Sequence, residues 1–384
     1  MDAELRSRAE AAAAVARAHA DEVDRDSRFP REALEAIKEQ RLLALMVATE
    51  DGGEGRSYRE IGEVTELLAA ACGSTGMVYA MHQNQIAGLV RHADTPYFAQ
   101  RRREAADKQL LIASATTEIG IGGDLRSSTC AVEADDAGHF ALEKNAPVIS
   151  YADDSDVIVV TARRNPDAGP ADQVLVYCDR AHVQLEKTFP WNVMGFRGTC
   201  SPGYILRTEN TTEAIFPEPF ADMLARCMLP GAHIFWASVW LGIANEAVGK
   251  ARAFVQNAAR KNPGSMPPGA PRLAELQITL QTFASTVHHA AERFDRLAPS
   301  DPELDSVPFA LAMNGLKVYA STTIVDIVSR AMLITGIAGY RLDTPYSLDR
   351  LLRDAFGAAI MVNNDRILGN SASLELINRR GGAW

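Results

Sequence analysis

The sequence predicts an α+β protein of three domains: an N-terminal helical domain (residues 1–110), a middle β barrel or sandwich (111–220) and a C-terminal four-helix bundle (221–384). Three observations predict this class. Apolar residues recur at helical spacing in the first part of the chain, short runs rich in β-branched residues follow from about residue 110, and helical periodicity returns after Pro217. A chain of 384 residues with 47% hydrophobic content is long enough for more than one core.

The N-terminal domain is predicted from its helix-forming segments. Residues 2–22 are rich in Ala, Glu and Arg, which favour a helix. Pro30 stands at a first-turn position of the next helix, and a glycine-rich break at 52–55 ends that helix. Apolar residues then recur at spacings of three and four from residue 61. Ser74 is predicted as the N-cap of a further helix that runs to about Val90.

Short strands without intervening helices define the middle domain. The runs rich in Val, Ile, Thr or Tyr are residues 129–133, 139–143, 157–162, 173–177, 183–186 and 204–207. Turn-forming clusters at 135–138 and 165–170 separate them. This spacing predicts a small antiparallel barrel or sandwich.

Long apolar helices define the C-terminal domain. The first, over residues 232–256, is apolar on most of its circumference and is therefore expected to be buried. A loop with four prolines follows at 261–272. Further helices are predicted at 273–297, 307–334 and 348–360, with a connection at 336–344. Four helices in succession predict an antiparallel bundle.

Composition excludes several other classes of protein. A net charge of −10 argues against nucleic-acid binding. No window reaches the ~18 unbroken apolar residues of a membrane span, and the first residues lack the basic-then-apolar order of a secretory signal, so a cytoplasmic protein is expected. The five cysteines are scattered without metal-ligand spacing, which predicts reduced structural thiols and no metal site.

Residues 114–124 join the helical first part to the strands and hold Gly120, Gly122 and Gly123 within four positions. Glycine at this density is typical of a tight turn or of a backbone that lies against a ligand, and the sequence alone leaves both open. The segment is not a dinucleotide-binding fingerprint, because strand-like sequence follows it.

Five motifs occur in order along nearly the whole chain. They are Thr117-Glu118 with Gly120 and Gly122-Gly123-Asp124, Met194-Gly195-Phe196-Arg197-Gly198-Thr199, Leu241-Gly242-Ile243-Ala244, Gly336-Ile337-Ala338-Gly339-Tyr340 and Asp349-Arg350-Leu351-Leu352-Arg353-Asp354-Ala355. Together they resemble the motifs of the acyl-CoA dehydrogenase superfamily. The resemblance implies the same order of domains as the pattern of predicted elements.

The resemblance also implies non-covalent FAD between the β domain and the bundle, and a homotetramer. By position, the flavin-binding candidates are Thr116, Thr117, Gly123, Ile149, Ser150, Arg260, Gly336, Asn364 and Arg366. Hydroxyl groups near a flavin stabilise the negative charge that develops on its reduced ring. The alternative for Thr117 and Ser150 is that they are ordinary strand and turn hydroxyls.

The resemblance breaks at the catalytic base. The family's glutamate falls on Val362 here, and its alternative location on the long helix falls on Ala232. His233 is the first candidate substitute, because an imidazole with a pKa near ~6.5 can accept or donate a proton. The alternative is that His233 only caps or solvates the helix start. Asp365 is a second candidate if its loop is shifted.

Three functions therefore stay open. The first is α,β-desaturation of acyl-CoA or another acyl thioester by an enzyme with a non-standard base, with an electron-transfer flavoprotein as acceptor. The second is a monooxygenase that uses reduced flavin from a separate reductase together with O₂. The third is a non-catalytic partner subunit. The sequence does not identify the substrate, because fold does not determine chemistry.

Overall fold

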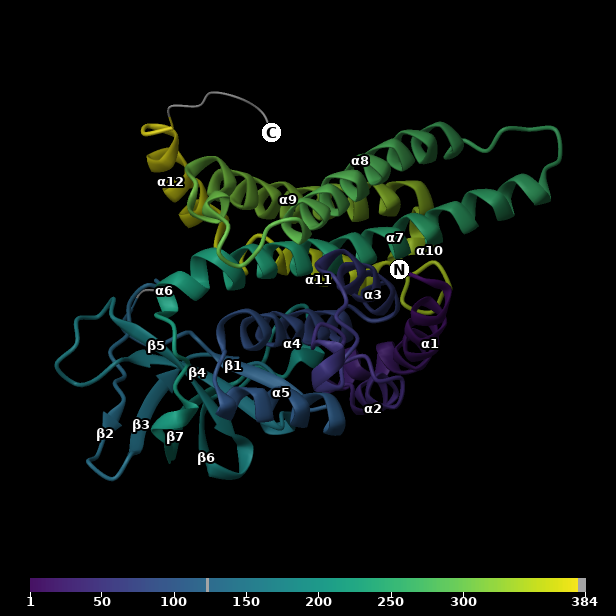
Figure 1. The fold of residues 1–384 in the computed structure, drawn as a ribbon. Helices are drawn as coiled ribbons and strands as arrows, with labels where there is room; N and C mark the ends of the chain where they lie inside the picture. Colours follow the sequence, from purple (N-terminus) through teal and green to yellow (C-terminus); the bar gives the residue numbers. More distant parts are fainter. Residues whose placement is uncertain (122–123, 379–384) are drawn as a thin grey trace.

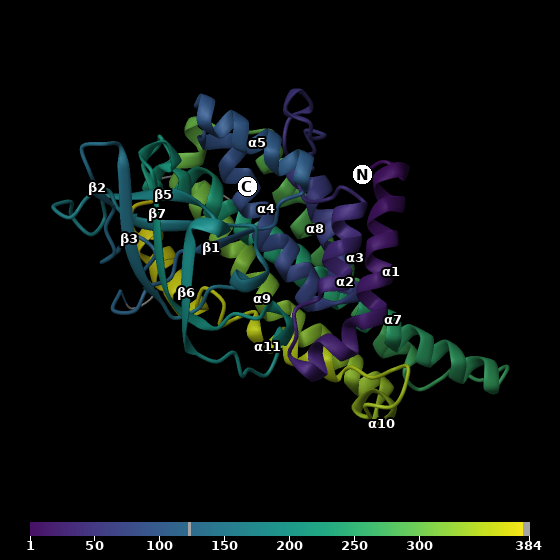
Figure 2. The same ribbon diagram turned by 90° about the horizontal axis from the view of Figure 1, so that it is seen from below.

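The computed structural model describes residues 1–121 and 124–378, in which a helical part, two small β-sheets and a second helical part follow one another (Figure 1). Figures 1 and 2 show the sheets gathered at one end of the molecule, while α7 extends from them to the opposite end. Buried residues of both helical parts and of the sheets form one hydrophobic cluster. The predicted α+β class and the order of its parts are confirmed.

The N-terminal helices have capping residues that the sequence supplies locally. The helices are α1 (Ala3–Asp26), α2 (Arg31–Glu39), α3 (Tyr58–Ala71), α4 (Gly73–His92) and α5 (Pro96–Lys108). The Asp2 carboxylate accepts from the Leu5 N–H at 2.8 Å, and Ser57 forms a capping box with Glu60. These caps fix where α1 and α3 begin.

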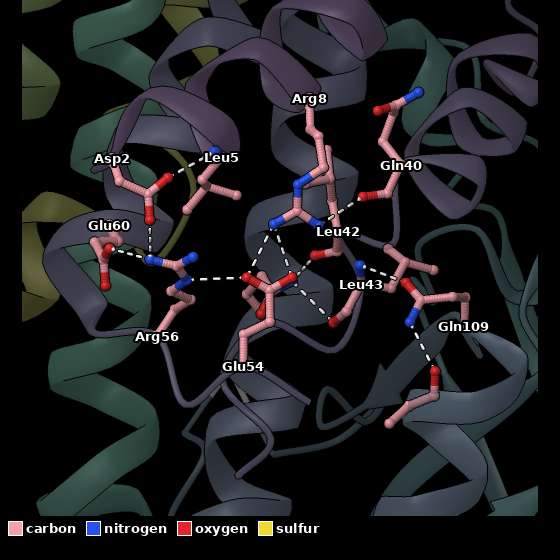
Figure 3. A network of polar contacts seen from close by, with 12 residues as sticks. Asp2, Leu5, Arg8, Gln40, Leu42, Leu43, Glu54, Arg56, Glu60 and Gln109 are labelled. Carbon is pink, nitrogen blue, oxygen red and sulfur yellow. Dashed lines mark hydrogen bonds and ion pairs between the residues drawn. The ribbon is translucent and has the colours of Figure 1, made fainter. Parts of the chain in front are cut away.

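An arginine and glutamate network joins α1 to the segment between α2 and α3 (Figure 3). Arg8 donates to both carboxylate oxygens of Glu54, at 2.7 and 2.9 Å, and to the Gln40 carbonyl at 3.2 Å. Arg56 reaches Asp2, Glu54 and Glu60 at 2.6 to 3.0 Å. A network of connected, charge-assisted hydrogen bonds holds the irregular segment more firmly than isolated surface pairs do.

The prediction that Ser74 caps α4 is wrong. The helix begins one residue earlier, at Gly73, because only Cys72 separates it from the end of α3. The Ser74 hydroxyl instead accepts a hydrogen bond from the Gly198 N–H at 3.1 Å. The residue therefore contacts the β domain rather than its own helix end.

The middle part forms two sheets. One has the order β1-β4-β5 and the other β2-β3-β7-β6. The strands are β1 (Ile112–Ala115), β2 (Glu133–Ala134), β3 (His139–Ala146), β4 (Val157–Arg163), β5 (Gln173–Asp179), β6 (Val183–Phe189) and β7 (Gly203–Thr211). Short 3-10 turns lie at Thr49–Asp51, Ala152–Asp154, Arg180–His182, Arg197–Thr199, Thr212–Ala214 and Pro302–Asp305.

Two predictions for the strands are corrected. The apolar run Ile112–Ala115 is a strand that the sequence reading did not assign, and it pairs parallel to β4, so the sheets are not wholly antiparallel. Of the predicted strand at 129–133, only Glu133 belongs to β2. The reason is that the backbone N–H groups of Thr129 and Cys130 donate to the Glu118 carboxylate instead of to a neighbouring strand.

The C-terminal part contains three long helices and several short ones. They are α6 (Phe220–Met223), a π-helical turn (Leu224–Met228), α7 (Leu229–Lys261), α8 (Ala270–Asp295), α9 (Val307–Thr335), α10 (Ile337–Tyr340), α11 (Asp349–Gly357) and α12 (Asn364–Glu375). The fourth predicted long helix is wrong in length. It ends at Gly357, the chain turns, and α12 follows as a helix that was not predicted.

Helices α3 and α7 approach unusually closely. A Cβ atom at Gly242 would lie 2.4 Å from the Glu66 carbonyl oxygen and 2.9 Å from the Ala69 Cβ. About two turns earlier on α7, Phe235 stacks on Tyr58 of α3 with ring centroids 5.3 Å apart. The span Phe220–Lys261 and the helix α9 are long and apolar enough to cross a membrane by composition, and both are core helices of this fold.

Candidate functional site

Hydroxyl groups from two segments of the β domain lie in one region. Thr116 and Thr117 follow β1 directly, and Thr117 Oγ1 donates to the Val148 carbonyl at 3.0 Å. This bond ties the segment after β1 to the segment that carries Ser150, whose Oγ accepts from Ser201 Oγ at 2.8 Å. Thr116, Thr117 and Ser150 are partly exposed. The structure therefore brings three predicted flavin-binding residues together on an accessible surface.

Ile149 belongs to the same segment but faces the core. Its side chain is fully buried, and its N–H donates to the Pro202 carbonyl at 3.1 Å. The exposed side chain of this segment is Val148, at 36%. Ile149 thus anchors the segment rather than presenting a side chain to a ligand. Gly123, another predicted cofactor residue, lies outside the described residues.

Glu118 anchors the segment after β1, a role that the sequence reading missed. Its carboxylate accepts from Ser128 Oγ at 2.7 Å, from the Cys130 N–H at 2.8 Å, and from Thr129. Lys144, which is also buried, lies 3.2 Å from the second carboxylate oxygen. Burial opposes ionisation, but the hydrogen bonds from Thr129 and the charge of Lys144 hold the pKa of Glu118 below its usual value. The ionised pair fixes the chain directly after Thr117.

A second fixed point joins the β domain to the C-terminal helices. Asp354 of α11 accepts from the Phe196 N–H at 2.5 Å. A Cβ atom at Gly195 would lie 2.3 Å from the Arg353 carbonyl oxygen, so only glycine fits there. Arg353 itself binds Asp24, Asp349 and the Met194 carbonyl. Two of the five sequence motifs, at 194–199 and 349–355, thus meet in space.

His233 lies within the helix, and it neither caps nor solvates a helix start. The helical path begins at α6, and the ring is 1% exposed between α7 and α9. The Nδ1 atom lies 3.0 Å from the Met313 carbonyl, which accepts only if Nδ1 carries the proton. The Nε2 atom is buried without a hydrogen-bond partner among the described residues. Burial lowers the pKa of His233 to about 4.

The other catalytic candidate lies in a different environment. Asp365 is exposed in the first turn of α12, where its N–H donates to the Asn363 side chain at 2.8 Å. Ala232 is buried in α7, and Val362 lies in the turn between α11 and α12 with a left-handed φ of 43°. A β-branched residue rarely adopts this conformation. Neither position at which the resemblance places the base carries a carboxylate itself.

Lys317 of α9 occupies the space behind that turn, and no sequence motif singled it out. Its side chain is fully buried. Its ammonium donates to the carbonyls of Ala358 and Val362, at 3.1 and 2.7 Å, and to Asn364 Oδ1 at 2.7 Å. Asn364 is therefore engaged by Lys317, and Ser321 also bonds it. The Asn364 side chain is therefore hydrogen-bonded within the protein. Arg366, which was also predicted to bind the cofactor, is exposed.

Two predicted cofactor residues lie far from the β domain in the same chain. Arg260 is exposed near the end of α7, and Gly336, with φ of 58°, separates α9 from α10. Figures 1 and 2 place these ends of α7 and α10 at the side of the molecule opposite the sheets. One chain therefore cannot bring Arg260 and Thr117 to the same cofactor.

Two hollows of the described structure lie away from this site. Two adjoining hollows of about 510 and 530 Å³ lie on the outer face of the β2-β3-β7-β6 sheet and share Glu133, His182 and Glu209. No predicted site residue lines them. No group of three His, Cys, Asp or Glu side chains in the described residues could hold a metal ion.

The residues on the β-domain side fit a flavin ring. Thr116, Thr117 and Ser150 offer partly exposed hydroxyls, and each segment is anchored from behind, by Glu118 and by Ile149. Hydroxyls on a rigid support are suited to the polar edge of a flavin, where charge develops on reduction. Val148 offers an apolar side chain for a ring face.

Comparison with known protein families matches both helical parts. Residues 3–103 match the acyl-CoA dehydrogenase N-terminal domain and residues 228–368 match the acyl-CoA dehydrogenase C-terminal domain. A 3-(aryl)acrylate reductase of Clostridium sporogenes is 25% identical over 353 residues, which cover 89% of each chain. A short-chain acyl-CoA dehydrogenase of Clostridium acetobutylicum is 24% identical over 356 residues, 88% of this chain and 87% of that protein.

Solved structures of two kinds share the fold. The FMN-bound dibenzothiophene monooxygenase of Paenibacillus sp. A11-2 superposes with a TM-score of 0.86 at 19% identity and 98% coverage of both chains. Butyryl-CoA dehydrogenase of Megasphaera elsdenii superposes with a TM-score of 0.81 at 18% identity, covering 98% of this chain and 99% of that one. At these identities the likeness extends to the fold alone.

Proposed function

Since this chain belongs to the acyl-CoA dehydrogenase superfamily, a family of flavin-dependent oxidoreductases, we propose that it oxidises an acyl thioester between Cα and Cβ with His233 as the base. The observation that carries this proposal is the Nε2 atom of His233, which is buried and unpartnered. A buried nitrogen without a partner is costly in a folded protein, and such groups recur at functional sites.

The ring of His233 suits a proton acceptor. Its Nδ1 proton is donated to the Met313 carbonyl, which leaves the lone pair on Nε2. Because burial lowers the pKa to about 4, the imidazole is neutral at pH 7, although it is a weaker base than an exposed histidine. In the proposed reaction Nε2 takes the α-proton of the thioester while the β-hydrogen leaves as hydride. A bound flavin supplies the acceptor for that hydride.

The flavin is proposed to be FAD, held by residues from two chains. Thr116, Thr117 and Ser150 of one chain would bind the ring. Arg260 and Gly336, at the opposite side of the molecule, would contact the phosphate or adenosine part of a cofactor bound to a neighbouring copy. This division supports the homotetramer that the resemblance implies. An electron-transfer flavoprotein is the proposed electron acceptor.

The residue at position 362, whose carbonyl Lys317 binds, favours a second function. Where related dehydrogenases are expected to carry a carboxylate, this chain presents Val362, whose carbonyl is bound by Lys317 at 2.7 Å. A monooxygenase that receives reduced flavin from a reductase and consumes O₂ does not need that carboxylate. In this reaction the neutral His233 would hold a proton-accepting position beside the substrate.

The two functions are separated by anaerobic mixing of the purified protein with a panel of acyl-CoA thioesters. Bleaching of the flavin band near ~450 nm by one thioester supports desaturation. The variant His233→Gln is then expected to slow bleaching by at least ~100-fold, the usual size of a general-base effect, while His139→Gln, on the exposed end of β3, leaves it unchanged. Turnover only with a reductase, reduced flavin and O₂ supports the monooxygenase, and failure to bind any flavin contradicts both.

A further inference from the structure

Lys317 is a buried cation that no carboxylate neutralises. It takes part in no ion pair among the described residues, and its three hydrogen-bond acceptors are two carbonyl oxygens and one amide oxygen. The ring of Trp240 lies 5.8 Å from the ammonium, and His233 of α7 is the titratable side chain that senses its charge. Burying an ammonium on these terms is expensive, and burial lowers the pKa of Lys317 to about 8.

All three acceptors lie on one turn, residues 358–364. Ala358 is the C-cap of α11, where unpaired carbonyls form the negative end of the helix dipole. Val362 directly precedes Asn363, the N-cap of α12, and Asn364 is the first residue of that helix. An ammonium has three N–H donors, so the protonated Lys317 satisfies this set completely.

The same turn carries backbone strain. Val362 has φ of 43°, a conformation in which its branched side chain crowds the backbone. Strain of this kind persists only where the surrounding contacts over-determine it, and it gathers at functional sites. The hydrogen bond from Lys317 to the Val362 carbonyl is the contact that holds this residue in place.

The last turn of α11, directly before Ala358, is fixed to the β domain. Asp354 accepts from the Phe196 N–H, and Gly357 packs against the Phe196 ring, where a Cβ atom would lie 3.2 Å from the ring. Lys317 therefore fixes the turn that follows directly on a helix end attached to the domain that carries Thr116, Thr117 and Ser150.

We propose that Lys317 is a positioning residue that shapes the turn 358–364 and thereby sets Val362 at the border of the flavin and substrate site. The placement of that border rests on the proposed function. The shaping of the turn rests on the contacts of Lys317 and stands independently of it. The role is not catalytic, because the ammonium has no donor left for a substrate.

The test compares Lys317→Met, which keeps the length and removes the charge, with Lys250→Met. Lys250 is a suitable control because it is a half-buried lysine on α7 that donates to one carbonyl, that of Ser347, at 3.0 Å. Hydrogen exchange of the peptide covering residues 356–366 is measured first, and it requires no knowledge of the reaction. We expect exchange in this peptide to rise by about tenfold or more in Lys317→Met and not in Lys250→Met, while peptides from α7 and α9 keep their protection.

Kinetics and flavin binding then test the position of the turn. In Lys317→Met the rate constant for flavin reduction by the reacting thioester is expected to fall by about tenfold, with a change in KM of less than about threefold. If no thioester reacts, the dissociation constant of FAD serves as the readout and is expected to rise by a similar factor. A failure of the proposed function shows as a wild-type protein that no thioester reduces. It is therefore distinguished from a failure of this inference, which shows only when Lys317→Met is compared with wild type.

Two results would overturn the inference. One is unchanged exchange over residues 356–366. The other is an opened turn with wild-type flavin affinity and rates, which would make Lys317 purely structural. If Lys317→Met does not fold, Asn364→Leu replaces it, since it removes only one of the three acceptors. In Asn364→Leu, a smaller rise in exchange over residues 356–366 and a smaller change in flavin affinity or reduction rate support the proposal. Unchanged exchange over these residues contradicts it.

Discussion

The carboxylate of Asp354 and the backbone N–H of Phe196 are 2.5 Å apart, and they join α11 to the loop between β6 and β7 although 158 positions separate them in the sequence. The pair is buried, and Arg350 is the cation that most lowers the pKa of Asp354. The two motifs that carry these residues therefore serve one junction. The burial of Asp354 at this junction leads to a prediction about how stability depends on pH.

Asp354→Asn is expected to change how stability depends on pH. Burial raises the pKa of Asp354 to about 6, against the hydrogen bond from Phe196 and the charge of Arg350, whereas an unfolded Asp titrates near ~3.9. Between these values the native state binds more protons, so the free energy of unfolding falls as pH rises from about 4 to about 6. Asn still accepts from Phe196 and does not titrate. Denaturant unfolding at pH 5 and pH 7 measures this effect. Between these pH values the free energy of unfolding should fall by about 1 kcal/mol more in wild type than in the variant. The exposed Asp365→Asn should behave as wild type.

His233→Gln is expected to have the opposite pH signature. An unfolded His binds a proton near pH ~6.5, but buried His233 does so only at about pH 4, so its contribution to stability is present above 6.5 and lost as pH falls toward 4. From pH 7 to pH 5 the variant should lose about 2 kcal/mol less than wild type. His82, whose pKa burial also lowers to about 4, retains its own share in the variant. Equal losses in both proteins would show that His233 is accessible to protons.

Gly242→Ala tests the close approach of α3 and α7. The added Cβ meets the Glu66 carbonyl at 2.4 Å, and backbone cannot yield as a side chain does, so we expect a loss of about 1–3 kcal/mol. Gly249→Ala on the same helix is the matched control, since nothing lies within 4 Å of its Cβ. There the lower entropy of the unfolded chain should stabilise the protein by up to ~1 kcal/mol. Thermal unfolding of the two variants should shift in opposite directions.

Glu118→Gln tests the anchor behind Thr116 and Thr117. The change leaves Lys144 buried without its counter-ion, which costs about 3–5 kcal/mol when a buried pair is broken on one side. We also expect weaker flavin binding, measured by titration of the apoprotein. The double variant Glu118→Gln with Lys144→Met should recover part of the stability. Glu143→Gln, on the exposed face of β3, should change neither quantity, and an equal effect there would refute the anchor.

Val362→Glu tests whether residue 362 borders the reacting atoms. If it does, a carboxylate there supplies a second base, and flavin reduction by acyl thioesters should accelerate by at least ~10-fold. Val362→Gln has nearly the same shape but accepts no proton, so it should give no acceleration. Equal rates in the two variants would place the side chain away from the substrate.

The sequence by itself determined the class of fold, the order of its parts and the presence of the long helices. Local signals were sufficient for this, because helical periodicity depends on residues that lie within a few turns of one another. The prediction that the second helix ends at the glycines 52–55 is wrong, because α2 ends at Glu39, and α5 was not predicted. The sequence also failed at Ser74, at residues 129–133 and after Gly357. In each of these three cases a hydrogen bond joins the segment to a distant residue. The Ser74 hydroxyl accepts from the Gly198 N–H, the N–H groups of Thr129 and Cys130 donate to the Glu118 carboxylate, and Lys317 donates to the turn before α12.

For the site, the sequence indicated His233, Thr116, Thr117 and Ser150 by their positions in motifs. Only the tertiary structure decided that the Nε2 atom of His233 is unpartnered and that the Asn364 side chain is engaged. It also revealed Lys317, which no motif marks because its meaning depends on three oxygen atoms at least 41 residues away. Periodicity and spacing report which face of a helix is buried, whereas the partner of a buried charge is set by how the helices and the sheets pack together.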